Sequence, residues 1–125
     1  MRTFIILITC TVLLSSCQPK QAEICFLSPS FDYDTLGFDD IRSHAFVFRN
    51  TGKAPLEIDH VSTSCGCTEF SYGKGAVMPN DTGSISVKYT PDAEGTFRKV
   101  IVVISNAANS PKTVLRLKGF VKKVS

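Results

Sequence analysis

The chain has no tryptophan and no strong excess of charge of either sign. Without tryptophan, its core has to be built from phenylalanine and the aliphatic residues. Fourteen basic residues stand against 11 acidic ones, a formal net charge of +3, and the basic residues are scattered along the sequence. Nucleic-acid binding proteins concentrate basic residues in a patch or a stripe, so we expect no nucleic acid among the partners.

The sequence also lacks the common catalytic motifs. It contains no glycine-rich phosphate loop and no G-x-S-x-G turn that would expose a nucleophilic serine. The acidic pairs Asp32/Asp34 and Asp39-Asp40 do not have the spacing of a calcium-binding EF-hand loop. We therefore predict a protein that is not an enzyme, with no catalytic residue and no cofactor other than a soft metal ion at its cysteines.

No apolar run is long enough to cross a bilayer, which takes about 20 residues. Residues 4–14 are apolar apart from two threonines and follow Arg2, the arrangement of a secretory signal peptide. They lead into Leu14-Ser15-Ser16-Cys17, an order that resembles the lipobox of bacterial lipoproteins. The sequence thus predicts a lipoprotein signal peptide at residues 1–16 and lipidation, palmitate included, at Cys17. The alternative is an ordinary signal peptide that is cut elsewhere.

The residues after Cys17 bear on location. Gln18 stands where an aspartate would favour retention in the inner membrane, so we expect the outer membrane. Residues 17–23 are mostly polar and form a predicted lipidated tether. They lack the acidic run that exports lipoproteins to the cell surface in some Bacteroidetes-like bacteria. We therefore predict a cell-envelope protein that is anchored in the outer membrane through lipid and faces the periplasm.

The rest of the chain has the pattern of short strands. Seven segments rich in β-branched and aromatic residues are separated by glycine, proline and asparagine. They are residues 24–28, 31–36, 43–49, 55–61, 84–90, 97–104 and 113–121. No stretch has a helical period. The pattern predicts an all-β domain over residues 24–125, an immunoglobulin-like antiparallel β-sandwich of about seven to eight strands.

A series of short motifs lies between residues 45 and 121. These are Asn50-Thr51-Gly52, Pro55-Leu56, Ser64-Cys65-Gly66-Cys67-Thr68, Pro79 to Gly83, Tyr89-Thr90-Pro91, Gly95 and Ser105-Asn106. The series resembles the bacterial family catalogued as domain of unknown function 1573, which is itself similar to Hydin-like immunoglobulin-type domains. The resemblance implies the sandwich fold but no activity, because the family has no established biochemical function. Hydin-like domains in general suggest contact with other proteins, an analogy of fold only.

The sequence Cys65-Gly66-Cys67 is the one cluster that suggests chemistry. In a straight strand the Cβ atoms of the two cysteines would lie nearly 7 Å apart, whereas a disulfide needs about 3.8 Å. A bond between them therefore requires a turn at Gly66. The ring would be small and easily reduced. Three interpretations of Cys65 and Cys67 therefore remain: a structural role as packed thiols or a disulfide, a labile redox pair, or contact with a metal ion.

Other residues enter these alternatives. Cys25 is a possible disulfide partner for one member of the pair across the sandwich. A soft ion such as Cu(I) accepts two thiolates, while zinc needs four ligands, so His60 joins Cys65 and Cys67 as a metal candidate. The side chains that offer further ligands for zinc are Cys25, His44, His60 and Met78.

These features together predict a membrane-anchored periplasmic lipoprotein that acts as a non-enzymatic interaction or scaffold module and binds a protein partner. The alternative is a thiol-based redox protein, or a protein that binds copper or zinc, with Cys65 and Cys67 as its functional residues.

Overall fold

The computed structural model describes residues 19–123, which form eight strands. They are β1 (Ile24–Phe26), β2 (Ser30–Leu36), β3 (Arg42–Asn50), β4 (Ile58–Thr63), β5 (Thr68–Tyr72), β6 (Thr82–Tyr89), β7 (Gly95–Ser105) and β8 (Lys112–Val121). No helix in this part of the chain has the length and apolarity to cross a membrane. The predicted signal peptide, residues 1–16, and the predicted lipidation site, Cys17, lie outside the described residues and stay predictions.

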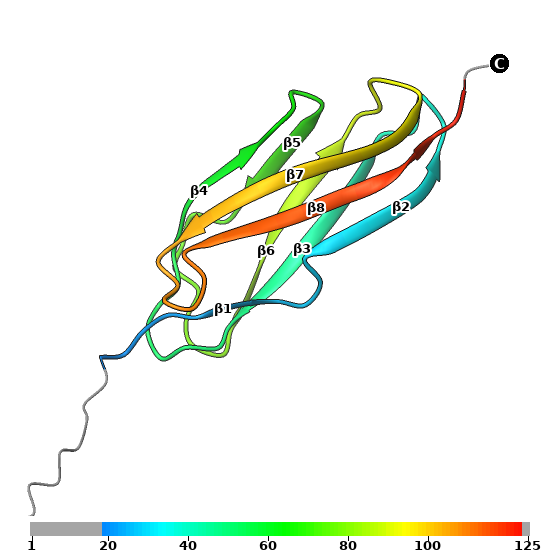
Figure 1. Ribbon diagram of the computed structural model, residues 1–125. Helices are drawn as coiled ribbons and strands as arrows, with labels where there is room; N and C mark the ends of the chain where they lie inside the picture. The colour runs from blue at the N-terminus through cyan, green and yellow to red at the C-terminus, as the bar shows by residue number, and fades with distance from the viewer. Residues whose placement is uncertain (1–18, 124–125) are drawn as a thin grey trace, which may run out of the picture.

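The strands form two four-stranded sheets, ordered β1-β3-β6-β5 and β2-β8-β7-β4, which face each other as two layers (Figure 1). The predicted immunoglobulin-like β-sandwich is confirmed, with one difference in pairing. Neighbouring strands are antiparallel except β2, which runs parallel to β8. The chain passes from one sheet to the other through residues 27–29, and β2 then continues in much the same direction as β1 (Figure 1).

One strand and one boundary differ from the sequence-based expectation. β5 was not among the seven predicted segments, although Thr68, Phe70 and Tyr72 alternate with polar residues and this alternation is the signal that could have found it. β4 begins at Ile58, three residues later than the predicted segment 55–61. Proline cannot donate a backbone hydrogen bond, and Leu56 forms only an isolated bridge with Val77, so the chain joins the sheet after them.

The core follows the alternation of the central strands. Alternate side chains in the middle of these strands point inward and are almost fully buried. These are Phe46 and Phe48 of β3, Ile85 and Val87 of β6, Ile101 and Val103 of β7, and Leu115 and Leu117 of β8. Large side chains of this kind each stabilise the folded state by about 1.5–3 kcal/mol through burial. The apolar segment 97–104 becomes part of β7, which lies inside its sheet between β8 and β4.

At one end of the sandwich, the N-terminal residues are held by the buried side chain of Asn50. Its amide nitrogen donates to the carbonyl oxygens of Ala54 (2.8 Å) and Val77 (2.9 Å). Its amide oxygen accepts from the N–H groups of Gly52 (2.9 Å) and Glu23 (3.4 Å). Asn50 is fully buried, so every hydrogen bond that its amide offers is made inside the protein.

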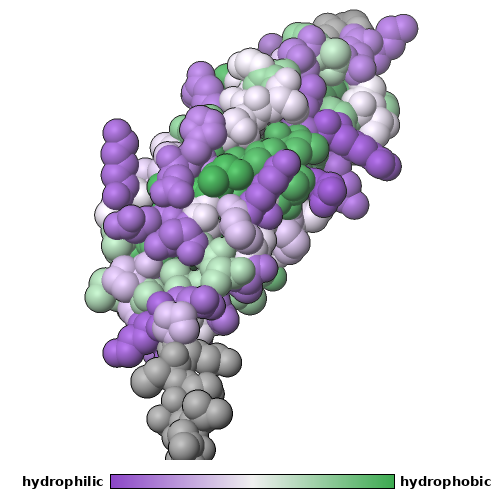
Figure 2. Space-filling view, turned by 60° about the vertical axis from the view of Figure 1, so that its left-hand side comes forward, coloured by the Kyte–Doolittle hydropathy of each residue, from purple (hydrophilic) through white to green (hydrophobic). Residues whose placement is uncertain are grey.

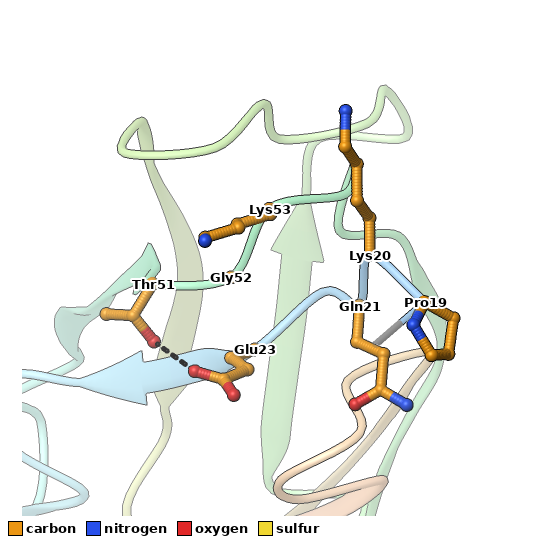
Figure 3. Close-up of a pocket in the computed structure, with 7 residues that line it drawn as sticks. All are labelled: Pro19, Lys20, Gln21, Glu23, Thr51, Gly52 and Lys53. Carbon is orange, nitrogen blue, oxygen red and sulfur yellow. Dashed lines mark hydrogen bonds between the residues drawn. The ribbon is translucent and has the colours of Figure 1, made fainter. Parts of the chain in front are cut away.

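The backbone of residues 21–23 adds to this attachment. The carbonyl oxygen of Gln21 accepts from Lys53 N–H at 2.8 Å, and that of Ala22 accepts from Ala108 N–H at 2.8 Å. Figure 3 shows the residues around this junction, with the Thr51 hydroxyl bonded to the Glu23 carboxylate. A side chain at Gly52 would overlap the backbone of Gln21 and Glu23. The last part of the predicted tether is therefore bound to the domain.

His44 of β3 bridges the two layers. Its ring stacks on Phe31 of β2, with centroids 3.7 Å apart, and meets the edge of Phe46 at 4.7 Å. The sequence offered His44 as a possible zinc ligand, and the structure places it half-buried against these rings. Burial lowers the pKa of His44 from its ordinary value, because the charged imidazolium loses contact with water there.

The first prediction concerns the buried amide. Asn50→Asp keeps the shape of the side chain but removes the two N–H donors and places a carboxylate against two carbonyl oxygens. We expect the free energy of unfolding, measured by urea denaturation, to fall by about 3 kcal/mol or more. The matched control is Asn80→Asp, at an exposed position. Equal stability of the two variants would contradict the role given to Asn50.

The second prediction concerns pH. The pKa of His44 is lower in the folded chain than in the unfolded one, so the unfolded chain binds the proton first as pH falls. Stability should be complete above about pH 6.5 and decline as pH falls below it. We expect the urea midpoint to fall less between pH 7.5 and pH 5 in His44→Phe than in the parent. An unchanged slope in His44→Phe would contradict the assignment.

Candidate functional site

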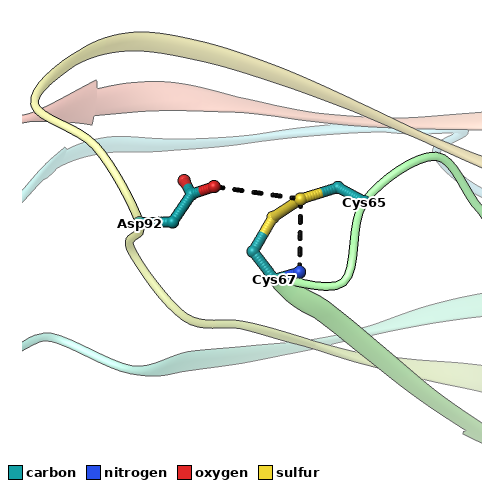
Figure 4. Close-up of side chains that lie close together, drawn as sticks. All are labelled: Cys65, Cys67 and Asp92. Atoms are coloured by element: carbon teal, nitrogen blue, oxygen red, sulfur yellow. Dashed lines mark hydrogen bonds between the residues drawn. A yellow bond between two sulfur atoms is a disulfide. The ribbon is translucent and has the colours of Figure 1, made fainter.

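Cys65 and Cys67 lie in the turn between β4 and β5 and are joined by a disulfide (Figure 4). Their Cα atoms are 5.3 Å apart, within the range that disulfides use. The Cys65 carbonyl oxygen accepts from the N–H of Thr68 (3.3 Å) and from the hydroxyl of Thr63 (3.1 Å). The pair therefore sits in a turn closed by hydrogen bonds and not in a straight strand, which is why the two sulfur atoms can meet.

A third side chain comes from a different part of the chain. Asp92, in the connection between β6 and β7, places Oδ2 3.9 Å from the Sγ atom of Cys65 (Figure 4). On the other side, the N–H of Cys67 donates to the same sulfur atom at 3.2 Å. The two sulfur atoms and the carboxylate oxygen all lie within 4.8 Å of one another. These three residues form the candidate site.

The other sequence candidates lie elsewhere. Cys25 is exposed on β1, pairs in register with Arg49 and is not in a disulfide, so the alternative bond across the sandwich is absent. His60 is exposed on β4 and is not part of the group of ligand atoms. His44 stacks between aromatic rings, and Met78 is exposed in the connection between β5 and β6.

Asp92 is the residue that sequence reasoning missed. It is 25 positions from Cys67, and no motif links the two segments. The pairing of β5 with β6 brings them together, because Thr68 lies opposite Tyr89 and the N–H of Thr90 donates to the Cys67 carbonyl oxygen at 2.9 Å. Only a correct register between these strands, with the missed strand β5 included, could have predicted this neighbour.

Tyr89 lies under this end of the sandwich. It is fully buried, stacks on Phe97 with centroids 4.2 Å apart, and its hydroxyl has no hydrogen-bond partner among the described residues. Burial raises the pKa of Tyr89, and the negative charge of Asp92 raises it further. The phenol therefore stays neutral at any ordinary pH.

The site shares its end of the sandwich with two exposed apolar side chains. Phe38 and Ile41, in the connection between β2 and β3, are 38% and 54% exposed. Residues 37–41, 64–67 and 90–94 all lie at this end, because β3 begins where β5 begins and where β6 ends. Residues 19–23 enter the domain at the opposite end (Figure 1). We call the end formed by these three connections the distal end.

The basic residues are less scattered in space than in sequence. Arg98 and Lys118 lie opposite each other on β7 and β8, and Arg116 lies two residues from Lys118 on the same outer face. They line a hollow of about 310 Å³. Asp32 of β2 lies opposite Lys118, so the cluster contains both signs of charge. Figure 2 likewise shows hydrophilic residues distributed around a hydrophobic area on one side of the molecule.

Solved structures similar to this chain show its fold. A protein of unknown function from Porphyromonas gingivalis W83 is 17% identical with a TM-score of 0.72; the match covers 79% of this chain but 46% of that one, so this chain spans less than half its length. The human CEP192 ASH/PapD-like domain 7 is 12% identical to this chain, with a TM-score of 0.68. The match covers 84% of this chain and 89% of that domain. WR4, a C. elegans MSP family member, is 12% identical to this chain, with a TM-score of 0.53. The match covers 81% of this chain and 99% of WR4.

Identities this low carry the fold and no activity. None of the curated proteins compared with the chain matches it. A family model does match: the one described as protein of unknown function, DUF1573, covers residues 24–121, nearly the whole sandwich and both cysteines of the disulfide. The chain therefore belongs to the DUF1573 family.

Proposed function

We propose that this chain is a lipid-anchored module of the cell envelope that binds a protein partner through its distal end and catalyses no reaction. The anchor is Cys17, and the place is the periplasmic side of the outer membrane. One observation carries the proposal: residues 19–23 join the domain at one end, while Cys65, Cys67, Asp92, Phe38 and Ile41 gather at the other. A domain held at its first end presents the second to the periplasm.

The distal end has the features of a binding surface. Loops at one end of a rigid sandwich are the usual recognition elements of immunoglobulin-like domains. Large apolar side chains that stay exposed in such loops supply contact area that a partner can bury. Phe38 and Ile41 are three positions apart in one short connection, and the disulfide lies across the same end.

The inside of the sandwich favours binding over catalysis. Its buried side chains are almost all apolar, and the polar exceptions, such as Asn50 and Thr68, belong to the frame of the strands and turns. An active site needs a recess in which reacting groups are held away from bulk water. The side chains with chemical capacity lie instead on the outside, at the distal end, where they meet another molecule's surface.

A second candidate function is thiol exchange or metal binding at Cys65 and Cys67. It is supported by the position of both cysteines in a turn at the end of the sandwich, where neither residue is fully buried. The ring between the two cysteines spans three residues, so bond formation restricts the unfolded chain little and stabilises the domain by only about 1.6 kcal/mol. A bond with so little structural value is more readily understood as reversible.

The third prediction tests the distal end as the binding surface. The double change Phe38→Ser with Ile41→Ser should reduce capture of envelope proteins by the tagged chain at least tenfold, because the partner loses buried apolar area at the centre of its contact. The control is Met78→Ser, which removes a 52% exposed apolar side chain at the opposite end. Quantitative mass spectrometry of the captured proteins compares the two. Equal capture by both variants would refute the assignment.

The fourth prediction tests the anchor. Cys17→Ala should move the chain from the membrane pellet to the soluble fraction of the cell envelope, because the acylated thiol is gone. Cys25→Ala, at the exposed cysteine of β1, should leave the chain in the pellet. Immunoblots of the two fractions after a high-salt wash give the measurement. Retention of the Cys17→Ala chain in the pellet would show that lipid is not what holds it.

A further inference from the structure

We propose that Cys65, Cys67 and Asp92 form a zinc site when the disulfide is reduced, with two thiolates and one carboxylate as ligands and a water molecule in the fourth position. The proposal rests on the second candidate function, the thiol chemistry of the cysteine pair. It is independent of the protein contact at Phe38 and Ile41. It replaces His60, the metal candidate from the sequence, with Asp92.

The spacing of the ligand atoms suits a tetrahedral zinc ion. With Zn–S bonds of about 2.3 Å and Zn–O bonds of about 2.0 Å, a sulfur and an oxygen ligand lie about 3.5 Å apart and two sulfur ligands about 3.8 Å apart. Oδ2 of Asp92 already lies 3.9 Å from Sγ of Cys65. Once the disulfide is broken, the sulfur atoms have only to separate by side-chain rotation for a zinc ion to fit among the three.

The frame of the site does not depend on the disulfide. Cys65 is held by the bonds from Thr63 and Thr68 to its carbonyl oxygen. Cys67 is tied to the segment that carries Asp92, because its carbonyl oxygen accepts from the N–H of Thr90. These bonds all involve backbone oxygens and persist when the sulfur atoms part. The backbone that carries the two cysteines is therefore already in position beside Asp92, which is what a metal site needs.

Polar groups of the turn lie beside both sulfur atoms. The N–H of Cys67 donates to Sγ of Cys65 at 3.2 Å, and the Thr68 hydroxyl lies 3.8 Å from Sγ of Cys67. The carboxylate of Asp92 repels a thiolate when no ion is present, and a divalent cation held among the three groups attracts each of them and offsets two of their three negative charges. The same carboxylate sets the preference for the metal, since a hard oxygen ligand suits Zn²⁺ and not Cu(I).

The redox step balances with an external dithiol. One thiolate of the dithiol attacks one sulfur of the disulfide, the bond between Cys65 and Cys67 breaks, and the other sulfur leaves and takes up a proton. The second thiol of the reagent then attacks the mixed disulfide, so the reagent ends as a disulfide and both cysteines as thiols. Zn²⁺ displaces the two thiol protons to water. An oxidising disulfide reverses the exchange, re-forms the bond and releases the zinc ion.

The fifth prediction tests this site on the full chain, purified in detergent with Cys10→Ser, Cys17→Ser and Cys25→Ser. Thiol labelling should detect neither remaining cysteine before treatment with dithiothreitol and both after it. The reduced chain, freed of reductant, should then bind about one zinc ion in competition with a chromophoric chelator. Co²⁺ in place of zinc should give the visible and sulfur-to-metal absorption bands of a tetrahedral thiolate site. The oxidised chain should bind neither ion.

Asp92→Asn should weaken zinc binding by about tenfold or more, as the loss of a metal-supporting group does elsewhere. The matched control is Asp59→Asn, at an exposed carboxylate of β4, which should bind as the parent does. Zinc affinity of Asp92→Asn equal to that of the parent, or zinc binding by the oxidised chain, would overturn the proposal. Free thiols without zinc binding would overturn the zinc site alone, while a chain that yields no thiols would also overturn the thiol function.

Discussion

The buried amide of Asn50 is the constraint on which one whole end of the molecule depends. It joins three segments that come from different parts of the chain: the N-terminal residues at Glu23, the turn after β3, and the segment at Val77 before β6. A fully satisfied buried amide tolerates one geometry only, because each lost bond would leave a buried polar atom unpaired. The direction in which the chain enters the domain is thereby fixed.

Two more asparagines extend this network. Asn109 forms a pair of bonds with the backbone of Ile24, at 2.9 Å each, and so substitutes for a neighbouring strand along the edge of β1. Asn106 joins the backbone of Glu57 and Pro55. β1 has only three residues and would pair weakly by itself. The side-chain amides make this end rigid, so the position of residues 21–23 relative to the two sheets is a fixed property of the fold.

The sequence predicted the parts of the structure that depend on local pattern. The predicted segment 84–90 corresponds to β6, and the predicted segment 43–49 corresponds to β3, which ends at Asn50. The same pattern could not reveal that the Asn50 side chain turns inward, since a turn asparagine is usually exposed. The sequence could not predict the place of Asp92 beside the cysteines for a different reason. Its neighbour Cys65 is brought to it by the register of β5 on β6, and register is a long-range property that no short motif encodes.

The two ends of the sandwich differ in what a change in chemistry can do. At the end where residues 19–23 join the domain, losing the hydrogen bonds of Asn50 would release the backbone of three segments from one another. At the distal end, the bond between Cys65 and Cys67 closes a ring of three residues beside a core that is already complete. Cys67 packs against the edge of that core, whereas Phe46, Ile101 and Leu115 are buried within it. The disulfide and the asparagine network lie at opposite ends of the same strands, so the chemistry available at Cys65 and Cys67 is separated by the length of the sandwich from the hydrogen bonds that hold residues 21–23.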